Sequence, residues 1–446
     1  MESPTRSVLV ATPEPLAARR AGPAVRAMRT AETLAADGHR VTLASTAAAP
    51  PTVTLDGVSV VGRADTPTDA EVVIVTGRAM LDLDWIAASD AVVGIDLYDP
   101  FQLEALHRGG DDRIRRIDLV EGAGRTLMAQ LGRGDRFFCA NEEQRSLWLG
   151  YLGATGRIND RTHGADPSLR SLIDLAPFGV DTTPPRPGPS PLRTIAGIGP
   201  DDPIAVWAGG LHDWLDPVTV IRAAAQLAET RPDFRLVFVA GPPPATQTAA
   251  PIARRARDEA AALGLTDRVV FFHDDWVPFD ERGALLLDAT IGVCAHGDHV
   301  EARFSHRTRF LDHLWAGLPT VTTGADPLSG RLAAVGAATV VEPGDHTALA
   351  AALAALLDDP DRRRAMADAA HGLGATLGWP DVLAPVSSWV AAATAAPDRL
   401  DPVISRRLGA GAHRRRGPID RLRMQWALEG PSGVARRVRR RSSRRS

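Results

Sequence analysis

The chain has 446 residues, a formal net charge of −3 and 44% apolar residues. Domains usually contain about 100–200 residues, so this length predicts two domains, each with a sizeable core. The near-neutral charge argues against a nucleic-acid partner for the whole molecule. No apolar run reaches about 18 residues, so we expect no membrane span. The first residues lead straight into a strand, and we expect no secretory signal.

Positive charge is concentrated at the end of the chain. Fourteen arginines lie between Arg406 and Ser446, against the two acids Asp420 and Glu429. Residues 398–446 contain too few apolar side chains to fold alone, so they predict an Arg-rich disordered tail. An arginine near an anionic membrane contributes about 1 kcal/mol of binding, so the tail predicts association with the inner face of the plasma membrane. A solubilising tail is the alternative.

The two cysteines, Cys139 and Cys294, each lie in an apolar run in a different half of the chain. This usage favours a reduced, cytoplasmic protein without disulfides. The chain contains no lysine. Any cation that binds phosphate must therefore be an arginine, unless backbone N–H groups do the work.

In the first half, short β-type runs alternate with helical segments. The segment at 24–36 has an apolar stripe near the helical period, and a strand-like run lies on each side of it. Such alternation predicts a parallel sheet covered on both faces, and the right-handed crossover rule makes it doubly wound. The predicted strands are residues 7–11, 40–44, 72–76, 91–95 and 136–140.

A stretch dense in Pro and Gly, residues 184–203, cannot form a regular element and predicts a linker. The same pattern then restarts. We therefore predict an α/β fold with two Rossmann-like doubly wound domains, residues 1–183 and 204–376, facing each other across a cleft. The strands predicted in the second domain are 204–208, 235–240, 269–273, 290–295 and 320–323, and its main helices are 216–229, 252–263, 282–289, 307–316, 346–357 and 360–373.

In doubly wound sheets, ligands bind at the carboxyl ends of the strands. Gly22 follows the first strand, where a glycine lets a diphosphate approach the N–H groups at a helix N-terminus. Gly209 and Gly210 stand at the equivalent place in the second domain. Neither loop matches G-x-G-x-x-G, and tight-turn geometry alone would also explain these glycines. Their repetition in both domains favours a phosphate site.

The densest group of polar side chains lies at 294–319, between two predicted strands. Arg307 and Thr308 fall in the first turn of the predicted helix, where backbone N–H groups favour an anion. Asp312, one turn later, suits the two adjacent hydroxyls of a ribose. A solvated polar loop is the alternative. The other residues of this stretch that we assign to the site are His296, Glu301, Arg303 and Ser305.

Several catalytic signatures are missing. No G-x-S-x-G, H-E-x-x-H or G-x-x-x-x-G-K-[ST] occurs, which argues against the familiar hydrolases, zinc proteases and P-loop ATPases. The side chains of His296, Asp298, His299 and Glu301 match no metal-ligand spacing. We therefore expect no metal and no other cofactor.

Two acids, Asp96 and Asp99, flank Tyr98 at the end of a predicted strand. Either could hold acceptor hydroxyls or act as a base. Asp99 also suits the N-cap of a helix that starts at Pro100, which leaves Asp96 as the better functional candidate.

Several segments, taken in chain order, resemble GT-B glycosyltransferases. They are VLVATPEPLAARRAGPAVRAMRTAETLAADGHRVTLAS near the start, FFCANEEQRSLWLG, PFGV and WAGGLHDWLDPVTVIRA. A further segment, RFSHRTRFLDHLWAGLPTVTT, resembles the donor-binding segment of glycosyltransferase family 4, in its actinobacterial branch. The resemblance spans roughly residues 7–395.

The resemblance implies a nucleotide-sugar donor on the C-terminal domain, an acceptor on the N-terminal domain, and metal-independent transfer with retention. It also implies that residues 377–397 form a helix that crosses back to the N-terminal domain. Asp312 aligns with the second acid of the family's E-x7-E pattern, which binds ribose. Phe304 stands where the family has its first Glu, and Glu301 is nearby. The family's Arg and Lys after the first C-terminal strand are absent here, so Arg303, Arg307 or Arg309 must supply the cation.

We therefore expect a glycosyltransferase that uses a UDP-, GDP- or dTDP-sugar and a glycan, lipid or small-molecule acceptor, in cell-envelope, glycolipid or secondary-metabolite synthesis. Arg307 and the glycine loops would stabilise the departing diphosphate. Glu301 and His296 would face the sugar, and Asp96 the acceptor. The alternatives are a sugar-nucleotide epimerase or phosphorylase on the same fold, and a catalytically silent GT-B scaffold protein.

Overall fold

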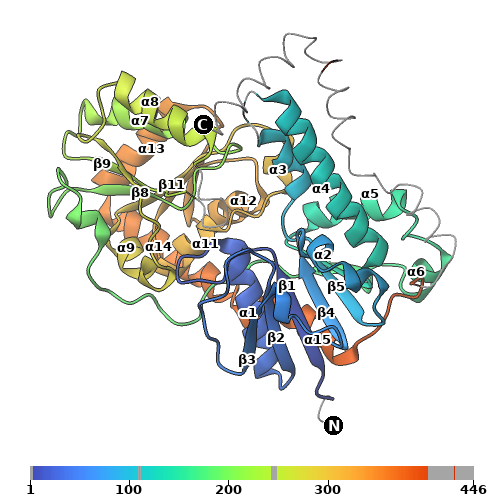
Figure 1. Ribbon diagram of the computed structural model, residues 1–446. Helices are drawn as coiled ribbons and strands as arrows, with labels where there is room; N and C mark the ends of the chain where they lie inside the picture. Colours follow the sequence, from blue (N-terminus) through green and yellow to red (C-terminus); the bar gives the residue numbers. More distant parts are fainter. Residues whose placement is uncertain (1–3, 109, 111, 243–248, 400–425, 427–446) are drawn as a thin grey trace, which may run out of the picture.

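The computed structural model describes residues 4–108, 110, 112–242, 249–399 and 426. The Arg-rich tail, for which we predicted disorder and membrane contact, lies almost wholly outside these residues. Two α/β domains lie side by side, and helices α11 and α12 lie where the domains meet (Figure 1). Among the described residues, no helix is long and apolar enough to cross a membrane.

The N-terminal domain is built on a seven-stranded sheet in the order β3-β2-β1-β4-β5-β6-β7, with every pair parallel. All five predicted strands are present. Its strands are β1 (Ser7–Thr12), β2 (Arg40–Ser45), β3 (Val58–Gly62), β4 (Val72–Thr76), β5 (Val92–Asp96), β6 (Arg136–Cys139) and β7 (Ile173–Leu175). Its helices are α1 (Gly22–Ala36), α2 (Ala79–Asp82), α3 (Phe101–His107), α4 (Arg113–Arg133), α5 (Glu142–Ala154) and α6 (Asp160–Ala165).

The C-terminal domain has six parallel strands in the order β10-β9-β8-β11-β12-β13. The strands are β8 (Ile204–Ala208), β9 (Arg235–Val239), β10 (Val270–His273), β11 (Ile291–Cys294), β12 (Thr320–Thr323) and β13 (Ala338–Val341). The helices are α7 (Pro217–Ala228), α8 (Pro251–Ala262), α9 (Arg282–Asp288), α10 (Val300–Phe304), α11 (Arg309–Ala316), α12 (Pro327–Ala334), α13 (His346–Asp358) and α14 (Pro360–Ala375).

In each sheet the strand order reverses next to the first strand, between β1 and β4 and between β8 and β11. Ligands of doubly wound folds bind outside the carboxyl ends of the strands at such points. The topology therefore places one ligand crevice in each domain, and the predicted two-domain α/β architecture is confirmed.

The proposed linker is more ordered than its composition suggests. Residues Pro191–Thr194 form a short 3₁₀ helix that begins at the cap Ser190. Leu192 is fully buried in the apolar cluster on one face of the C-terminal sheet. The prediction that no regular element forms here is therefore wrong, because one apolar side chain anchors the segment.

Helix α15 (Trp379–Ala392) packs against α1 of the N-terminal domain. Two glycines make room for its tryptophans: a Cβ on Gly94 would lie 2.7 Å from the ring of Trp389, and one on Gly179 only 2.5 Å from that of Trp379. This helix links the apolar cores, since one buried cluster runs through α1, α15 and the C-terminal sheet.

Candidate functional site

The two domains touch at the start of α11. No side chain caps this helix, and its first turn lies beside the loop that ends at Gly22. A Cβ on Gly22 would lie 3.6 Å from Oγ1 of Thr308 and 3.7 Å from Phe178. The two segments that sequence reasoning linked to phosphate thus face each other across the domain boundary. A larger residue at Gly22 would fill the space between them.

The loop after β8 is held by an arginine of α11. Gly209 has a φ of +120°, a conformation that side chains rarely adopt, so a glycine is required there. Arg309 donates hydrogen bonds to the carbonyl oxygens of Ala208 (2.7 Å) and Gly210 (2.9 Å), and its guanidinium lies over the ring of Trp207. A third donor of Arg309 points to Sγ of Cys294 at 2.8 Å. A cation therefore stands beside a loop that contains none of its own.

Glu301 and Arg307 form a buried bidentate ion pair. Nη1 and Nη2 of Arg307 lie 3.1 and 2.7 Å from the two carboxylate oxygens of Glu301. The Glu301 side chain is fully buried and that of Arg307 is 8% exposed. Nε of Arg307 has no hydrogen-bond partner among the described residues. The predicted diphosphate ligand and the predicted catalytic acid thus neutralise each other in this structure.

Asp312 sits on the exposed side of α11 and is partly open to solvent. Its Oδ1 accepts a hydrogen bond from Nε of Arg282 at 3.1 Å. The Arg282 guanidinium stacks on Phe279 and Trp315 and also bonds to Asp181 of the N-terminal domain. One carboxylate oxygen of Asp312 is left for a ligand. Arg282 was not anticipated, because nothing in its local sequence marks it.

The remaining predicted residues of this stretch, the donor-binding Arg303 and Ser305 and the catalytic His296, lie apart from one another. Ser305 is buried and its hydroxyl bonds to the carbonyl of Ala302. His296 is fully buried and its Nε2 lies 4.0 Å from Oδ2 of Asp326. Arg303 is exposed and lines a separate pocket beside α12. The structure therefore does not bring Arg303 and Ser305 to the α11 N-terminus, because the chain turns between α10 and α11.

Asp96 is engaged by Arg26. The Asp96 carboxylate accepts hydrogen bonds of 2.6 and 2.9 Å from Nε and Nη2 of Arg26, and both side chains are buried. Arg26 also donates to the carbonyls of Ala176 and Pro177. The expectation that Asp96 faces the acceptor is therefore corrected, since the pair fastens α1 and β5 to the segment after β7.

Three other carboxyl groups gather around the end of β5. Asp99 caps no helix, and no hydrogen bond or ion pair of its side chain is recorded within the described residues. Burial raises the pKa of Asp99 well above its usual range, and the charges of Glu104, Asp96 and Glu14 add to the effect. Burial also raises the pKa values of Glu104 and Glu14, and Arg108 opposes both shifts. Sequence reasoning preferred Asp96, which the structure pairs with Arg26, over Asp99, which has no recorded partner among the described residues.

Helices α3 and α5 close the cleft from the N-terminal side. Gln144, fully buried, donates to the carbonyls of Tyr98 and Phe304, one in each domain. Arg108 of the loop after α3 lies over the ring of Trp214. No sequence pattern marks Gln144 beyond its place in the first turn of α5. Among the described residues, no group of three His, Cys, Asp or Glu side chains could hold a metal ion.

Residues 191–372 match the family described as Glycosyl transferases group 1. This part of the chain is a glycosyltransferase group 1 domain. The match covers β8 to β13 and contains Gly209, Glu301, Arg307, Arg309 and Asp312. The predicted family resemblance is thereby confirmed for residues 191–372.

The chain is also similar to proteins named D-inositol 3-phosphate glycosyltransferase. One from Nocardia farcinica is 30% identical over 220 residues, which are 49% of this chain and 46% of that protein. One from Kineococcus radiotolerans is 29% identical over 319 residues, 66% of this chain and 67% of that protein. The chain therefore spans about half the length of the first of these relatives.

Solved structures share the fold. A sucrose-phosphate synthase from Thermosynechococcus elongatus is 15% identical, with a TM-score of 0.61, and the match covers 87% of this chain and all of that one. WaaG, a glycosyltransferase involved in lipopolysaccharide biosynthesis, is 16% identical with a TM-score of 0.61, over 86% of this chain and 99% of that one. The predicted GT-B fold is thus confirmed.

Proposed function

We propose that this protein transfers a glycosyl group from a nucleoside diphosphate sugar to an acceptor hydroxyl, with retention of the anomeric configuration. One observation carries the proposal: within the glycosyltransferase domain, the uncapped N-terminus of α11 faces Gly22 of the other domain, with Arg307 and Arg309 beside it. Backbone N–H groups and guanidinium groups at a helix start favour a diphosphate.

The diphosphate has to compete for Arg307. In this structure the guanidinium of Arg307 is neutralised by Glu301, whereas Arg309 is bound to backbone carbonyls and has no carboxylate partner among the described residues. We infer that the donor diphosphate takes over Arg307 and releases Glu301. The freed carboxylate would then accept a hydrogen bond from a hydroxyl of the transferred sugar. Arg307 and the α11 amides would stabilise the negative charge that develops on the leaving diphosphate.

The acceptor side is assigned to Asp99. A carboxyl group whose pKa is raised is better matched to proton transfer near neutral pH than an ordinary aspartate. The acceptor hydroxyl would attack from the face of the departing diphosphate as the bond from the sugar to the diphosphate breaks. Asp99 would accept its hydrogen bond and take its proton. Asp312 would hold the donor ribose through its free oxygen.

The test is release of nucleoside diphosphate from UDP-, GDP- and dTDP-sugars, with and without an acceptor panel. The names of relatives and structural neighbours suggest inositol phosphate and glucose phosphate for that panel. Release that requires an acceptor, and that falls in Asp312→Ala, supports transfer. A donor that is altered without an acceptor would indicate an epimerase, and phosphate-dependent release a phosphorylase. No turnover with any donor would favour a silent scaffold.

The Arg-rich tail supports a further proposal, membrane association. Its excess of arginine over acid, from Arg406 onward, favours anionic lipid. Flotation with anionic vesicles at two salt concentrations would compare the full chain with a variant that ends at residue 405. Stronger, salt-sensitive flotation of the full chain is expected, and equal flotation would reject the idea.

A further inference from the structure

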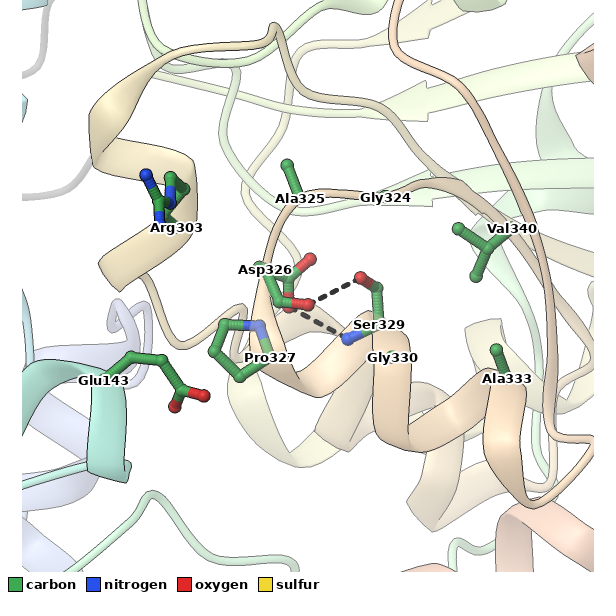
Figure 2. Close-up of a pocket in the computed structure, with 10 residues that line it drawn as sticks. All are labelled: Glu143, Arg303, Gly324, Ala325, Asp326, Pro327, Ser329, Gly330, Ala333 and Val340. Atoms are coloured by element: carbon green, nitrogen blue, oxygen red, sulfur yellow. Dashed lines mark hydrogen bonds between the residues drawn. The ribbon is translucent and has the colours of Figure 1, made fainter.

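A pocket separate from the α11 N-terminus lies at the carboxyl ends of β12 and β13. It has a volume of about 360 Å³ and spans both domains, since Glu143 comes from α5 and Arg303 from α10 (Figure 2). Its remaining wall is formed by the loop after β12, by α12 and by β13. The lining residues there are Gly324, Ala325, Asp326, Pro327, Ser329, Gly330, Ala333 and Val340.

Helix α10 connects this pocket to the proposed donor site. Glu301, on its buried side, pairs with Arg307, whereas Arg303 is exposed toward the pocket. A second link runs through His296, whose Nε2 lies 4.0 Å from Oδ2 of Asp326. Neither atom has a hydrogen-bond partner among the described residues, and 4.0 Å is too long for a direct bond. Both side chains are fully buried, so this pair lies behind the pocket wall and joins the wall to the strand end after β11.

The polar groups of the pocket are of mixed character. Glu143 offers an acceptor and Arg303 a donor, and no ion pair or hydrogen bond of either side chain is recorded within the part of the chain that is described. Asp326 uses Oδ1 to cap α12 through the amides of Leu328 and Ser329, and its Oδ2 is buried with no hydrogen-bond partner among the described residues. Two carboxyl groups against one guanidinium disfavour an isolated anion, and the guanidinium disfavours a cation.

We propose that this pocket binds a neutral, hydroxyl-rich ring, the saccharide or cyclitol part of the acceptor. The volume lies at the small end of ligand pockets, about 300–1,000 Å³, which suits a single ring. Part of the pocket wall carries little or no side chain, so ring hydroxyls can approach the polar groups closely. These lining residues are Gly324, Gly330 and Ala333. The inference rests on the proposed glycosyl transfer and assigns the acceptor a contact with the C-terminal domain.

Gly330 offers a way to fill the pocket without disturbing the fold. It lies within α12, and a Cβ added there meets no atom within 4 Å. Leucine is a better helix former than glycine, so Gly330→Leu is expected to fold. Gly372 of α14 has the same open surroundings but lies outside the pocket, which makes Gly372→Leu the matched control.

The experiment is saturation-transfer NMR on the full chain, with myo-inositol and methyl glucoside as probes. At least one probe should bind the wild type and Gly372→Leu equally. Gly330→Leu should weaken that binding about tenfold or more because the added side chain fills the pocket. Arg303→Ala should weaken it by a similar factor, the loss expected for a hydrogen bond to a charged group. The subsite is overturned if neither probe binds, or if Gly330→Leu binds the probe as the wild type does. It is also overturned if inorganic phosphate displaces the bound probe more readily than the second of the two neutral probes does.

The two proposals fail in different ways. If probe binding depends on Gly330 but no donor is ever turned over, glycosyl transfer is rejected and the subsite stands. If transfer occurs and Gly330→Leu leaves the acceptor KM unchanged, the subsite is rejected and the transfer stands. Both proposals predict a tenfold increase in that KM in Gly330→Leu with its nucleotide affinity unchanged, and no change of either quantity in Gly372→Leu.

Discussion

The two sides of the cleft handle charge in opposite ways. On the C-terminal side, Arg307 is neutralised by Glu301 and Arg309 is bound to backbone carbonyls. On the N-terminal side, burial raises the pKa values of the carboxyl groups of Glu14, Asp99 and Glu104, and the charge of Arg108, which pairs with Glu104, opposes these shifts. The C-terminal side must therefore open an ion pair for Arg307 to bind an anion, whereas on the N-terminal side Asp99 has no recorded hydrogen bond or ion pair among the described residues.

Removing one member of the ion pair should have the largest effect. Arg307→Met leaves Glu301 buried and unpaired, which we expect to lower the free energy of unfolding by about 3–5 kcal/mol. The double variant Arg307→Met/Glu301→Gln should recover most of that loss, and neither variant should bind nucleoside diphosphate. Urea unfolding measures the stability. A single variant within about 1 kcal/mol of the wild type would contradict the buried pair.

Removing the base on the other side should separate activity from stability. Asp99→Asn is expected to lower the transfer rate by about 10²–10⁴, the range for a general base. It should also stabilise the fold at neutral pH, because the raised pKa in the folded state makes the charged form unfavourable as the pH rises. This stability gain should grow from acidic to neutral pH.

The matched control is Asp90→Asn at an exposed position just before β5, where neither effect is expected. Rates and urea midpoints at several pH values provide the measurement. A variant Asp99→Asn that is active, or less stable than the wild type at neutral pH, would show that Asp99 is not a buried base.

The C-terminal side should show the opposite pH dependence. Burial lowers the pKa values of His212, His306 and His313 to about 3. Between about pH 6.5 and 3 the unfolded chain binds protons that the folded chain does not, so stability should fall as the pH falls. Each such histidine contributes about 1.4 kcal/mol per pH unit to this slope.

Replacing one of them tests that slope. His306→Gln should flatten the pH dependence of stability by about 1.4 kcal/mol per pH unit below pH 6.5. His163→Gln, at an exposed position in α6, is the control and should leave the slope unchanged. The measurement is urea unfolding from pH 7 to 4. Identical slopes in both variants would mean that His306 is protonated in the folded state.

The smallest effect is expected at the proposed ribose contact. Asp312 is part-exposed and offers one free oxygen, so Asp312→Asn should weaken donor binding about tenfold. Asp312→Glu keeps the carboxylate and should retain more of the affinity. Calorimetric titration with the active nucleotide distinguishes them. Equal affinities in the wild type and both variants would remove Asp312 from the site.

The fold was predictable because its signals are local. Each central strand is a short apolar run, such as Val72–Thr76 and Ile204–Ala208, with turn residues on both sides. The structure adds β3, β7 and β13. These strands lie at sheet edges, are short, and are partly exposed in β3 and β13, so their residues lack a continuous apolar run.

The position of the candidate site was predictable from the sequence, but the ion-pair partners of its charged side chains were not. The position of Arg307 next to a helix start follows from the sequence, whereas its partner depends on how the chain turns between α10 and α11. Asp96 presents the same problem, since its partner Arg26 lies 70 residues away. Which charges are neutralised is decided by tertiary contacts, and no spacing in the sequence reveals them.

The most direct test of the central claim is calorimetric titration of UDP, GDP and dTDP into the wild type and Glu301→Gln. If the diphosphate takes Arg307 from Glu301, removing the competing charge should tighten binding of the preferred nucleotide by about tenfold. Because the free nucleotide lacks the sugar, the proposed sugar contact of Glu301 does not obscure the result. Failure of every nucleotide to bind the wild type, or binding no tighter in Glu301→Gln, would contradict a donor site at the N-terminus of α11.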